Sequence, residues 1–344
     1  MKSIVFFNNK GGVGKTTLTC NVCSYLSQYM GKQVLLIDAD PQCNSTQILL
    51  GEDILHDLYF REVQTHKTLF GYLSPLKDGE AAIDTKIVPV PARETAFRTD
   101  LVPGHPRMSL IEDRLSRAWS DFQGGDRIPG YRTTNWISQL FTGVDKQYDY
   151  VVFDVGPSLG ALNRTVLLSC DYVVTPFGSD IFSLLGIKNI SSWIDEWGGD
   201  YRTALQELTR KEPGAITKYP GVTNIDSKHR FAGYSVQQYV ARKFKTGKRP
   251  VKAFDDIMAI IPETVETHLR KFVAQGLDPS QLKLGDIPFL YSLAPLAQSH
   301  KVPIHELVNA KAVSGAQVKQ VADYHNLMKV FCEQLLKNVG DAAR

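Results

Sequence analysis

Residues 2–17 read KSIVFFNNKGGVGKTT, and the architecture of the chain follows from this segment. Residues 4–7 form a short apolar run, which predicts a buried strand. After residue 17, apolar residues recur at helical spacing as far as Gly31, which predicts a helix that ends there. The glycines between strand and helix let the backbone turn so that successive N–H groups point at phosphate oxygens. We therefore predict a strand, a phosphate-binding loop and a helix whose positive dipole end faces the phosphates.

The side chains at the end of this loop suit a nucleotide and its magnesium ion. We expect Lys15 to reach the terminal phosphates and the Thr16 hydroxyl to ligate Mg²⁺. The common G-x-x-x-x-G-K-[ST] motif has glycine where this chain has Asn9, and a second lysine, Lys10, precedes the glycine pair. KGGVGKTT is the deviant Walker A sequence, and with it the chain resembles the ParA/MinD family of P-loop ATPases. The residues that we assign to nucleotide binding are Lys10, Gly11, Gly12, Val13, Gly14, Lys15, Thr16 and Thr17.

Two further strand-like segments end in aspartate. Residues 33–37 lead into DADPQCN at 38–44, and residues 148–153 lead into Asp154. In a doubly wound sheet, acidic residues at the carboxyl ends of strands face a bound ligand. The first segment resembles the family's D-x-D-P-Q-x-N switch, and the second resembles its Walker B strand. The resemblance implies that Asp40 positions the attacking water, while Asp38 and Asp154 hold Mg²⁺ through its water shell.

The chain departs from the family pattern at two places. The family usually has two prolines after the Walker B aspartate, and here Gly156 replaces the first of them, which we expect to loosen this loop without affecting metal binding. Residues 287–295 and 301–304 resemble later family elements, with Phe289 where arginine is common. The resemblance is thus specific over residues 1–50 and 148–195 and looser over 285–308.

The resemblance implies an α/β fold: a doubly wound, mostly parallel sheet flanked by helices, of the deviant Walker A class of P-loop NTPases. A length of 344 residues suits one large domain or two ordinary ones, and no linker is evident. We predict a single domain over 1–344 with insertions at about 52–132 and 199–285. In the first insertion we expect helices near 54–70 and 108–121, a strand at 101–104, glycine and proline loops at 122–130 and a helix near 133–146.

Positive charge is concentrated in one segment. The whole chain has a formal net charge of only +3, which excludes a histone-like protein. Residues 242–252 nevertheless contain six cations and no acid, namely Arg242, Lys243, Lys245, Lys248, Arg249 and Lys252. This cluster predicts binding of DNA phosphates without sequence preference, and a solvated basic loop is the alternative. The resemblance supports the first interpretation, because partition ATPases of this family bind non-specific DNA as ATP dimers.

Cysteine content and hydropathy predict a cytoplasmic protein, associated with the nucleoid if it binds DNA. Five scattered cysteines do not suggest a disulfide framework, and we expect Cys20 and Cys23 to be core residues of the first helix. No apolar run approaches the roughly 18 residues of a membrane span. The apolar stripe of the helix expected at 315–338 should pack on the sheet rather than on a membrane, because few cations lie on its other face.

The resemblance implies an ATP hydrolase, weak until a partner stimulates it, with ATP and Mg²⁺ as cofactors. Lys10 is expected to act across the interface of an ATP-dependent homodimer, so that Lys10, Lys15 and Asp40 are the catalytic residues. Two functions stay open. The first is DNA partition or cargo positioning, with non-specific DNA and a ParB-like or other stimulating protein as partners. The second is a nucleotide switch in a regulatory, phage-defence or membrane-associated complex that does not bind DNA.

Overall fold

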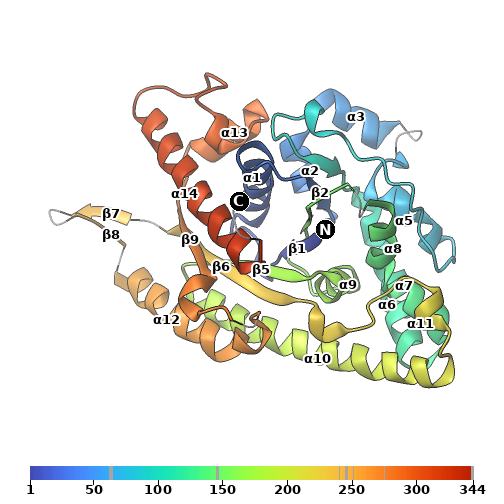
Figure 1. Ribbon diagram of the computed structural model, residues 1–344. Helices are drawn as coiled ribbons and strands as arrows, with labels where there is room; N and C mark the ends of the chain where they lie inside the picture. Colours follow the sequence, from blue (N-terminus) through green and yellow to red (C-terminus); the bar gives the residue numbers. More distant parts are fainter. Residues whose placement is uncertain are drawn as a thin grey trace.

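The computed structural model describes residues 1–61, 65–144, 147–239, 241–244, 247–250, 252–274 and 276–341. One sheet contains the strands β1 (Lys2–Phe6), β2 (Val34–Asp38), β3 (Asp100–Val102), β4 (Tyr150–Asp154), β5 (Tyr172–Gly178), β6 (Arg230–Tyr239) and β9 (Lys283–Pro288). Their order is β3-β2-β4-β1-β5-β6-β9, and every neighbouring pair is parallel (Figure 1). The prediction of a doubly wound, mostly parallel sheet is confirmed.

Helices cover both faces of the sheet, because the strands are apolar on both sides. Val5 and Val151 point into one core, whereas Ile4 and Val152 point into the other. The first core contains residues of α5 (Leu69–Lys77), α6 (Ser109–Gly124), α7 (Arg127–Thr134), α8 (Trp136–Val144), α9 (Ala161–Ser169), α10 (Ile181–Lys211), α11 (Ala215–Lys218) and α12 (Lys252–Leu269). The second contains residues of α1 (Lys15–Met30), α2 (Asn44–Leu49), α3 (Glu52–Phe60), α13 (Leu293–His300) and α14 (Ala316–Asn338).

The first helix begins and ends where the sequence predicts. Helix α1 lies between Gly14 and Gly31, both in the left-handed backbone region at φ 79° and 62°. Glycine adopts this conformation without the penalty that a Cβ atom brings. Cys20 and Cys23 are buried free thiols inside α1, which confirms that they are core residues.

The first predicted insertion agrees with the structure in part. Strand β3 lies close to the expected 101–104, and α6 close to the expected 108–121. Of the expected helix at 54–70, residues 54–60 belong to α3, residues 69–70 begin α5, and residues 62–64 lie outside the described residues. The prediction of loops at 122–130 was wrong for most of these residues, because α6 continues to Gly124 and α7 begins at Arg127. Pro129 is the third residue of α7, where no intrahelical bond needs its missing N–H.

The remaining helix of this region is shorter than expected, and the C-terminal helix is packed as expected. Helix α8 covers Trp136–Val144, and the last two residues of the predicted 133–146, Asp145 and Lys146, lie outside the described residues. Phe331 and Leu335 of α14 are buried against the sheet, although Val318 and Val330 of the predicted stripe are exposed. Within the described ranges, no helix is both long and apolar enough to cross a bilayer.

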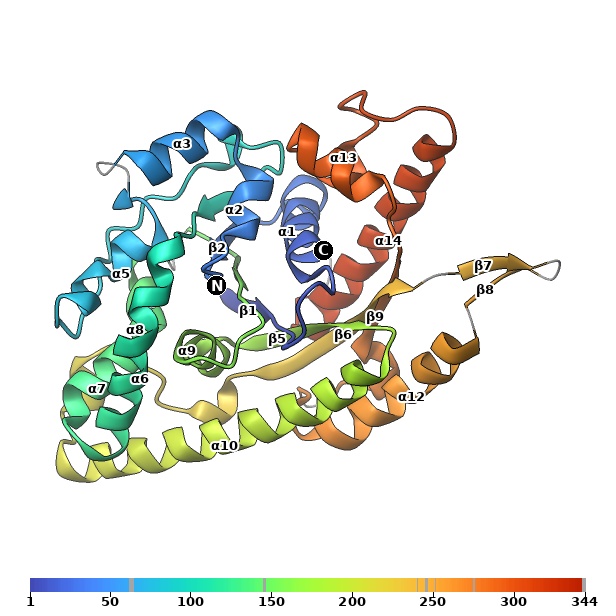
Figure 2. The same ribbon diagram turned by 180° about the vertical axis from the view of Figure 1, so that it is seen from behind.

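Two short strands stand apart from the sheet. Strand β7 (Ala241–Phe244) pairs antiparallel with β8 (Gly247–Pro250), and the pair extends away from the body of the molecule (Figure 2). This hairpin follows β6 directly and leads into α12. The prediction of one domain with two insertions stays a prediction.

Candidate functional site

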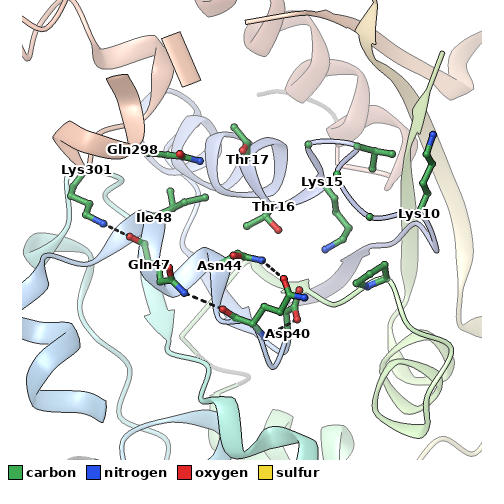
Figure 3. Close-up of a pocket in the computed structure, with 16 residues that line it drawn as sticks. Lys10, Lys15, Thr16, Thr17, Asp40, Asn44, Gln47, Ile48, Gln298 and Lys301 are labelled. Carbon is green, nitrogen blue, oxygen red and sulfur yellow. Dashed lines mark hydrogen bonds between the residues drawn. The ribbon is translucent and has the colours of Figure 1, made fainter. Parts of the chain in front are cut away.

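The loop at residues 10–17 lines a cavity of about 560 Å³ at the carboxyl end of β1 (Figure 3). Gly12 and Gly14 have φ values of 75° and 79°, which side chains other than glycine rarely adopt. A Cβ atom at Gly12 would meet nothing within 4 Å, so the backbone conformation and not space requires this glycine. The other residues that line the cavity are Asp40, Gln42, Asn44, Gln47, Ile48, Pro157, Gln298 and Lys301.

Lys15 extends from the first turn of α1 and is 7% exposed. Its ammonium lies 2.8 Å from Asp154 Oδ1 and also donates to the Val155 carbonyl. The second carboxylate oxygen of Asp154 accepts a bond of 2.7 Å from the Ser45 hydroxyl. The structure thus brings the predicted Walker A lysine and Walker B aspartate into direct contact.

Asp38 lies beside Asp154, because β2 and β4 pair in a register that puts the two residues opposite each other. Its Oδ2 accepts bonds from the Thr46 N–H at 2.8 Å and from the Thr46 hydroxyl at 2.6 Å. Burial, with a contribution from the charge of Asp154, raises the pKa of Asp38 to about 7. Asp38 is therefore fixed behind the cavity, and its predicted role near Mg²⁺ stays a prediction.

Asp40 borders the cavity and is 4% exposed. Its Oδ1 accepts the Gln42 N–H at 2.9 Å, and burial raises its pKa. Gly156, which stands where the family usually has proline, packs against this carboxylate. A Cβ atom at residue 156 would lie only 3.2 Å from Asp40 Oδ1. The absence of a side chain at Gly156 thus leaves room for the carboxylate that is expected to position water.

Lys10 does not join the other predicted catalytic residues in this chain. In Figure 3 its side chain points away from Lys15 and Asp40. Its ammonium forms an ion pair of 2.6 Å with Asp180, the N-cap residue of α10. The two partners are 170 positions apart in the sequence.

Oxygen donors that suit Mg²⁺ converge on the cavity. Thr16 and Asp40 line it, and the Asp154 carboxylate lies behind Lys15. Among the residues that the structure describes, no three carboxylate, histidine or cysteine side chains group closely enough to hold a metal ion. A magnesium ion here would therefore need phosphate and water oxygens as further ligands. Of the residues predicted to hold the ion, Thr16 lines the cavity and Asp154 lies behind Lys15, whereas Asp38 does not line the cavity, so the predicted set stays a prediction.

Sequence reasoning missed the hydroxyl residues that fix the two buried aspartates. Ser45 donates to Asp154, and Thr46 donates to Asp38 and accepts the Gly104 N–H at 2.8 Å. Both residues directly follow the DADPQCN segment, at the start of α2. Their position directly after this motif is the feature of the sequence that could have identified them as site residues.

A smaller cavity of about 110 Å³ adjoins the loop on the side of β9. It shares Gly14 and Thr17 with the first cavity and is otherwise largely apolar. Phe289 and Tyr291 line it, with ring centroids 4.8 Å apart. This is where Phe289, found in place of the family's arginine, lies.

The predicted basic cluster falls largely on the projecting hairpin. Arg242 and Lys243 belong to β7, Lys248 and Arg249 to β8, and Lys252 is the first residue of α12. Lys245 lies outside the described residues. The backbone register pairs Arg242 with Arg249 and Lys243 with Lys248. The described part of the cluster thus has a strand backbone and not a loop backbone, and both interpretations, DNA binding and a solvated basic segment, stay predictions.

Known proteins resemble this chain over its N-terminal part above all. A family model described as an AAA domain matches residues 1–206. A virulence plasmid ParA family protein, pGP5-D of Chlamydia psittaci, is 32% identical over 200 residues, or 58% of this chain and 66% of the relative. The sporulation initiation inhibitor protein Soj of Bacillus subtilis is 27% identical over 189 residues, or 55% of this chain and 63% of the relative. The chain belongs to the ParA/MinD family of P-loop ATPases. It matches less than two thirds of the length of these two family members.

Solved structures extend the resemblance to the whole fold. Protein DIP2308 of Corynebacterium diphtheriae superposes with a TM-score of 0.71 at 31% identity, covering 90% of this chain and 99% of that protein. The pNOB8 ParA structure superposes with a TM-score of 0.58 at 20% identity, covering 98% of each chain. The strands and helices of this chain, including those beyond residue 206, therefore follow a ParA-like arrangement.

Proposed function

We propose that this chain is an ATP-dependent, dimerising ATPase switch of the ParA type that acts in DNA partition or cargo positioning. The convergence of Lys15, Asp40 and Asp154 on the cavity of the deviant Walker A loop carries this proposal. Among structural neighbours with the same fold, Cyanothece McdA is described as an ATP complex, at a TM-score of 0.55. The relatives named ParA and Soj support the class of function.

ATP would lie with its phosphates on the backbone N–H groups of residues 10–17. Lys15 would hold the terminal phosphates, and Thr16, Asp38 and Asp154 would hold Mg²⁺ directly or through its waters. The small apolar cavity beside Gly14 is the place for the base, with Phe289 and Tyr291 as its aromatic wall. When bound, Mg²⁺ would neutralise charge that develops on the phosphates.

The protein's own contribution to hydrolysis would come from Asp40 and Lys10. Asp40 has one carboxylate oxygen fixed by Gln42, and its second oxygen would orient the attacking water. Its raised pKa favours acceptance of a proton from this water. Lys10 would enter the site of a second chain, where its charge would stabilise the transferring phosphoryl group. Two chains would then enclose two nucleotides, and hydrolysis would release them.

Phosphate release and sedimentation velocity test this proposal. With Mg²⁺ and ATP, wild type should turn over slowly and sediment as a dimer. Asp40→Ala should lose turnover but keep ATP binding and the dimer, whereas Lys10→Ala should lose turnover and weaken the dimer. Asp195→Ala, which removes an exposed ion pair with Lys271, is the matched control and should behave as wild type. A wild-type mass that is the same with and without ATP would contradict the dimer switch.

We further propose that the hairpin binds DNA through its phosphates. Its register places cation opposite cation, and such pairs repel across antiparallel strands, so a polyanion would stabilise the ribbon. One structure of the same fold is described as pNOB8 ParA bound to nonspecific DNA, at a TM-score of 0.55. A gel shift with ATP should show binding by wild type and none by a variant with the six cations of 242–252 changed to Gln. If wild type fails to bind DNA at low salt, the second function, a switch in a protein complex, is favoured.

A further inference from the structure

Lys10 is held by two contacts on the first turn of α10. Its ammonium lies 2.6 Å from Asp180 Oδ2 and 5.9 Å from the centroid of the Phe182 ring. The second contact is within the range of a cation–π interaction. The pair is partly accessible, since the side chains of Lys10 and Asp180 are 40% and 32% exposed. Solvent and a second protein can therefore reach it.

Both partners of this ion pair are fixed to the sheet. Asp180 caps α10, because its Oδ1 accepts the Phe182 N–H at 3.0 Å, and this bond orients its Oδ2 toward Lys10. The Lys10 N–H donates to Asn8 Oδ1 at 3.0 Å, and Asn8 Nδ2 donates to the Pro176 carbonyl of β5 at 2.6 Å. The pair thus bridges the loop after β1 and the helix after β5 through defined bonds at each end.

Gly178, two positions before Asp180, leaves the space that the Asp180 carboxylate occupies when it binds Lys10. A Cβ atom at Gly178 would lie 2.5 Å from Asp180 Oδ2, the oxygen that binds Lys10. A larger residue there would displace the carboxylate from Lys10. Glycine at the last residue of β5 therefore leaves the Asp180 carboxylate free to take the position in which it binds Lys10.

We propose that Asp180 is a positioning residue that retains Lys10 in its own chain, so that a second chain receives this lysine only after the ion pair opens. This inference rests on the proposed function, in which Lys10 acts across a dimer interface. An exposed ion pair changes an equilibrium by up to about fivefold. Since each of two chains must open one pair, retention weakens the dimer by up to about 25-fold.

The test is the dissociation constant of the dimer, measured by sedimentation with Mg²⁺ and a non-hydrolysable ATP analogue. Asp180→Asn removes the charge but keeps the helix cap, because Asn caps helices as well as Asp does. We expect the constant to fall by about 2- to 25-fold relative to wild type. Asp226→Asn, which breaks the exposed ion pair with Arg202, is the matched control and should leave the constant unchanged.

Two further variants separate retention of Lys10 from a purely structural role. Asp180→Ala loses the cap as well as the charge. If capping is the only role of Asp180, Asp180→Asn will match wild type while Asp180→Ala alone changes, and the inference is overturned. In a Lys10→Ala background, Asp180→Asn should no longer tighten the dimer, because the pair is already absent. An equal gain in both backgrounds would also overturn it.

The outcome for wild type distinguishes this inference from the proposed function. If wild type dimerises with the analogue and Asp180→Asn has the same constant, only the retention of Lys10 is refuted. If neither protein dimerises at any concentration reached, the proposed dimer switch fails and the retention of Lys10 fails with it.

Discussion

Lys15 and Asp154 form an ion pair at the centre of the candidate site, and both side chains are largely buried. Asp154 is fully buried, and its oxygens are taken by Lys15 and Ser45. Removal of one partner of such a pair leaves an uncompensated buried charge, which destabilises a protein by about 3–5 kcal/mol. The lysine expected to bind phosphate is therefore also a structural residue.

Lys15→Met should lower the free energy of unfolding by about 3 kcal/mol and abolish nucleotide binding. The loss of stability follows from the unpaired Asp154 carboxylate, and the loss of binding follows from the missing phosphate contact. Urea unfolding and titration with a fluorescent nucleotide measure the two effects. The double variant Lys15→Met/Asp154→Asn should recover much of the stability without recovering binding. Equal stability of wild type and the single variant would refute this account.

His305 is a buried titratable residue far from the loop in sequence. Its ring packs edge-on against Tyr25 and Tyr29, and its pKa is lowered to about 3 by burial and, to a smaller extent, by His325. The folded chain therefore keeps this imidazole neutral where the unfolded chain would protonate it. Stability from this group is complete above pH 6.5 and is lost as the pH falls toward 3.

Between pH 7 and pH 5, His305 should lower the free energy of unfolding of wild type by about 2 kcal/mol. His305→Phe keeps an aromatic ring but has no titrating group at this position. Its free energy of unfolding should therefore decrease by about 2 kcal/mol less than that of wild type over the same pH range. Urea unfolding of both proteins at the two pH values gives the difference. His300→Gln removes an exposed histidine and should follow the wild-type profile. A parallel decrease in wild type and His305→Phe would contradict the assignment.

Site residues that belong to a motif could be predicted from the sequence. Site residues that only the folding of the chain brings together could not. The loop, Asp40 and Asp154 could be found because their spacing from a strand is regular. The contact between Lys10 and Asp180 could not, since the neighbours β1 and β5 bring together residues 170 positions apart. Ser45 and Thr46 look like ordinary helix residues until their hydroxyls are seen on the buried aspartates.

Helices α6 and α7 pack against each other at a glycine, Gly130. A Cβ atom at Gly130 would lie 2.8 Å from the Ala118 carbonyl oxygen and would also collide with the backbone of Phe122. Both neighbours are backbone atoms of α6, so they cannot move aside as a side chain could. This close approach explains why glycine occurs inside a helix that its composition disfavours.

Gly130→Ala should destabilise the chain by about 1–3 kcal/mol, because the added methyl group pushes α7 away from α6. Thermal or urea unfolding detects this change. Gly124→Ala is the matched control, since residue 124 ends α6 and a Cβ atom there would meet nothing within 4 Å. This control should be neutral or slightly stabilising. Equal effects of the two substitutions would show that helix packing does not depend on Gly130.

Helices and strands with a strong hydrophobic pattern could be predicted from the sequence. Those whose conformation depends on packing against neighbouring elements could not. The apolar runs of β1, β2 and β4 are buried on both faces and were all found. Helix α7 was mistaken for a loop because Pro129 and Gly130 stand side by side in its first half, although its packing on α6 decides its conformation. The hairpin was missed because its four-residue strands, ARKF and GKRP, each carry two adjacent cations and have no hydrophobic pattern.

The charge of the whole molecule is distributed unevenly. A net charge of +3 is small, and yet six cations lie within residues 242–252. Replacement of these six by neutral residues would turn the net charge to −3. The hairpin that bears most of them extends from the body, where a long polyanion could reach it from both sides.

If these six cations neutralise DNA phosphates, the logarithm of the binding constant should fall against the logarithm of salt concentration with a slope of about −5 for each chain. The variant with all six changed to Gln should lose most of this slope as well as the affinity. Fluorescence anisotropy with a random-sequence duplex over a range of salt concentrations measures both. Replacing the exposed Lys311 and Lys319 by Gln should change neither. A steep slope that persists in the six-fold variant would place the DNA site elsewhere.

At the scale of the fold, the class could be predicted but the order of strands could not. The loop motif and the acidic strand ends predict a parallel sheet with helices on both sides. They do not reveal that β6 and β9, from the poorly matched second half, continue this sheet beyond β5. Those strands are bordered by polar residues and by long helices, so the sequence alone does not show where they pair.

The contact of α1 with α14 has a consequence for folding during synthesis on the ribosome. Residues 15–30 leave the ribosome early, yet one face of α1 is covered by residues 316–338. At about 5–20 residues per second, roughly 15 to 60 seconds separate the synthesis of these two helices. During this interval the apolar side of the nucleotide-binding half is open to chaperones and to other nascent chains. A ribosome that stalls before α14 emerges would therefore release an aggregation-prone half of the molecule.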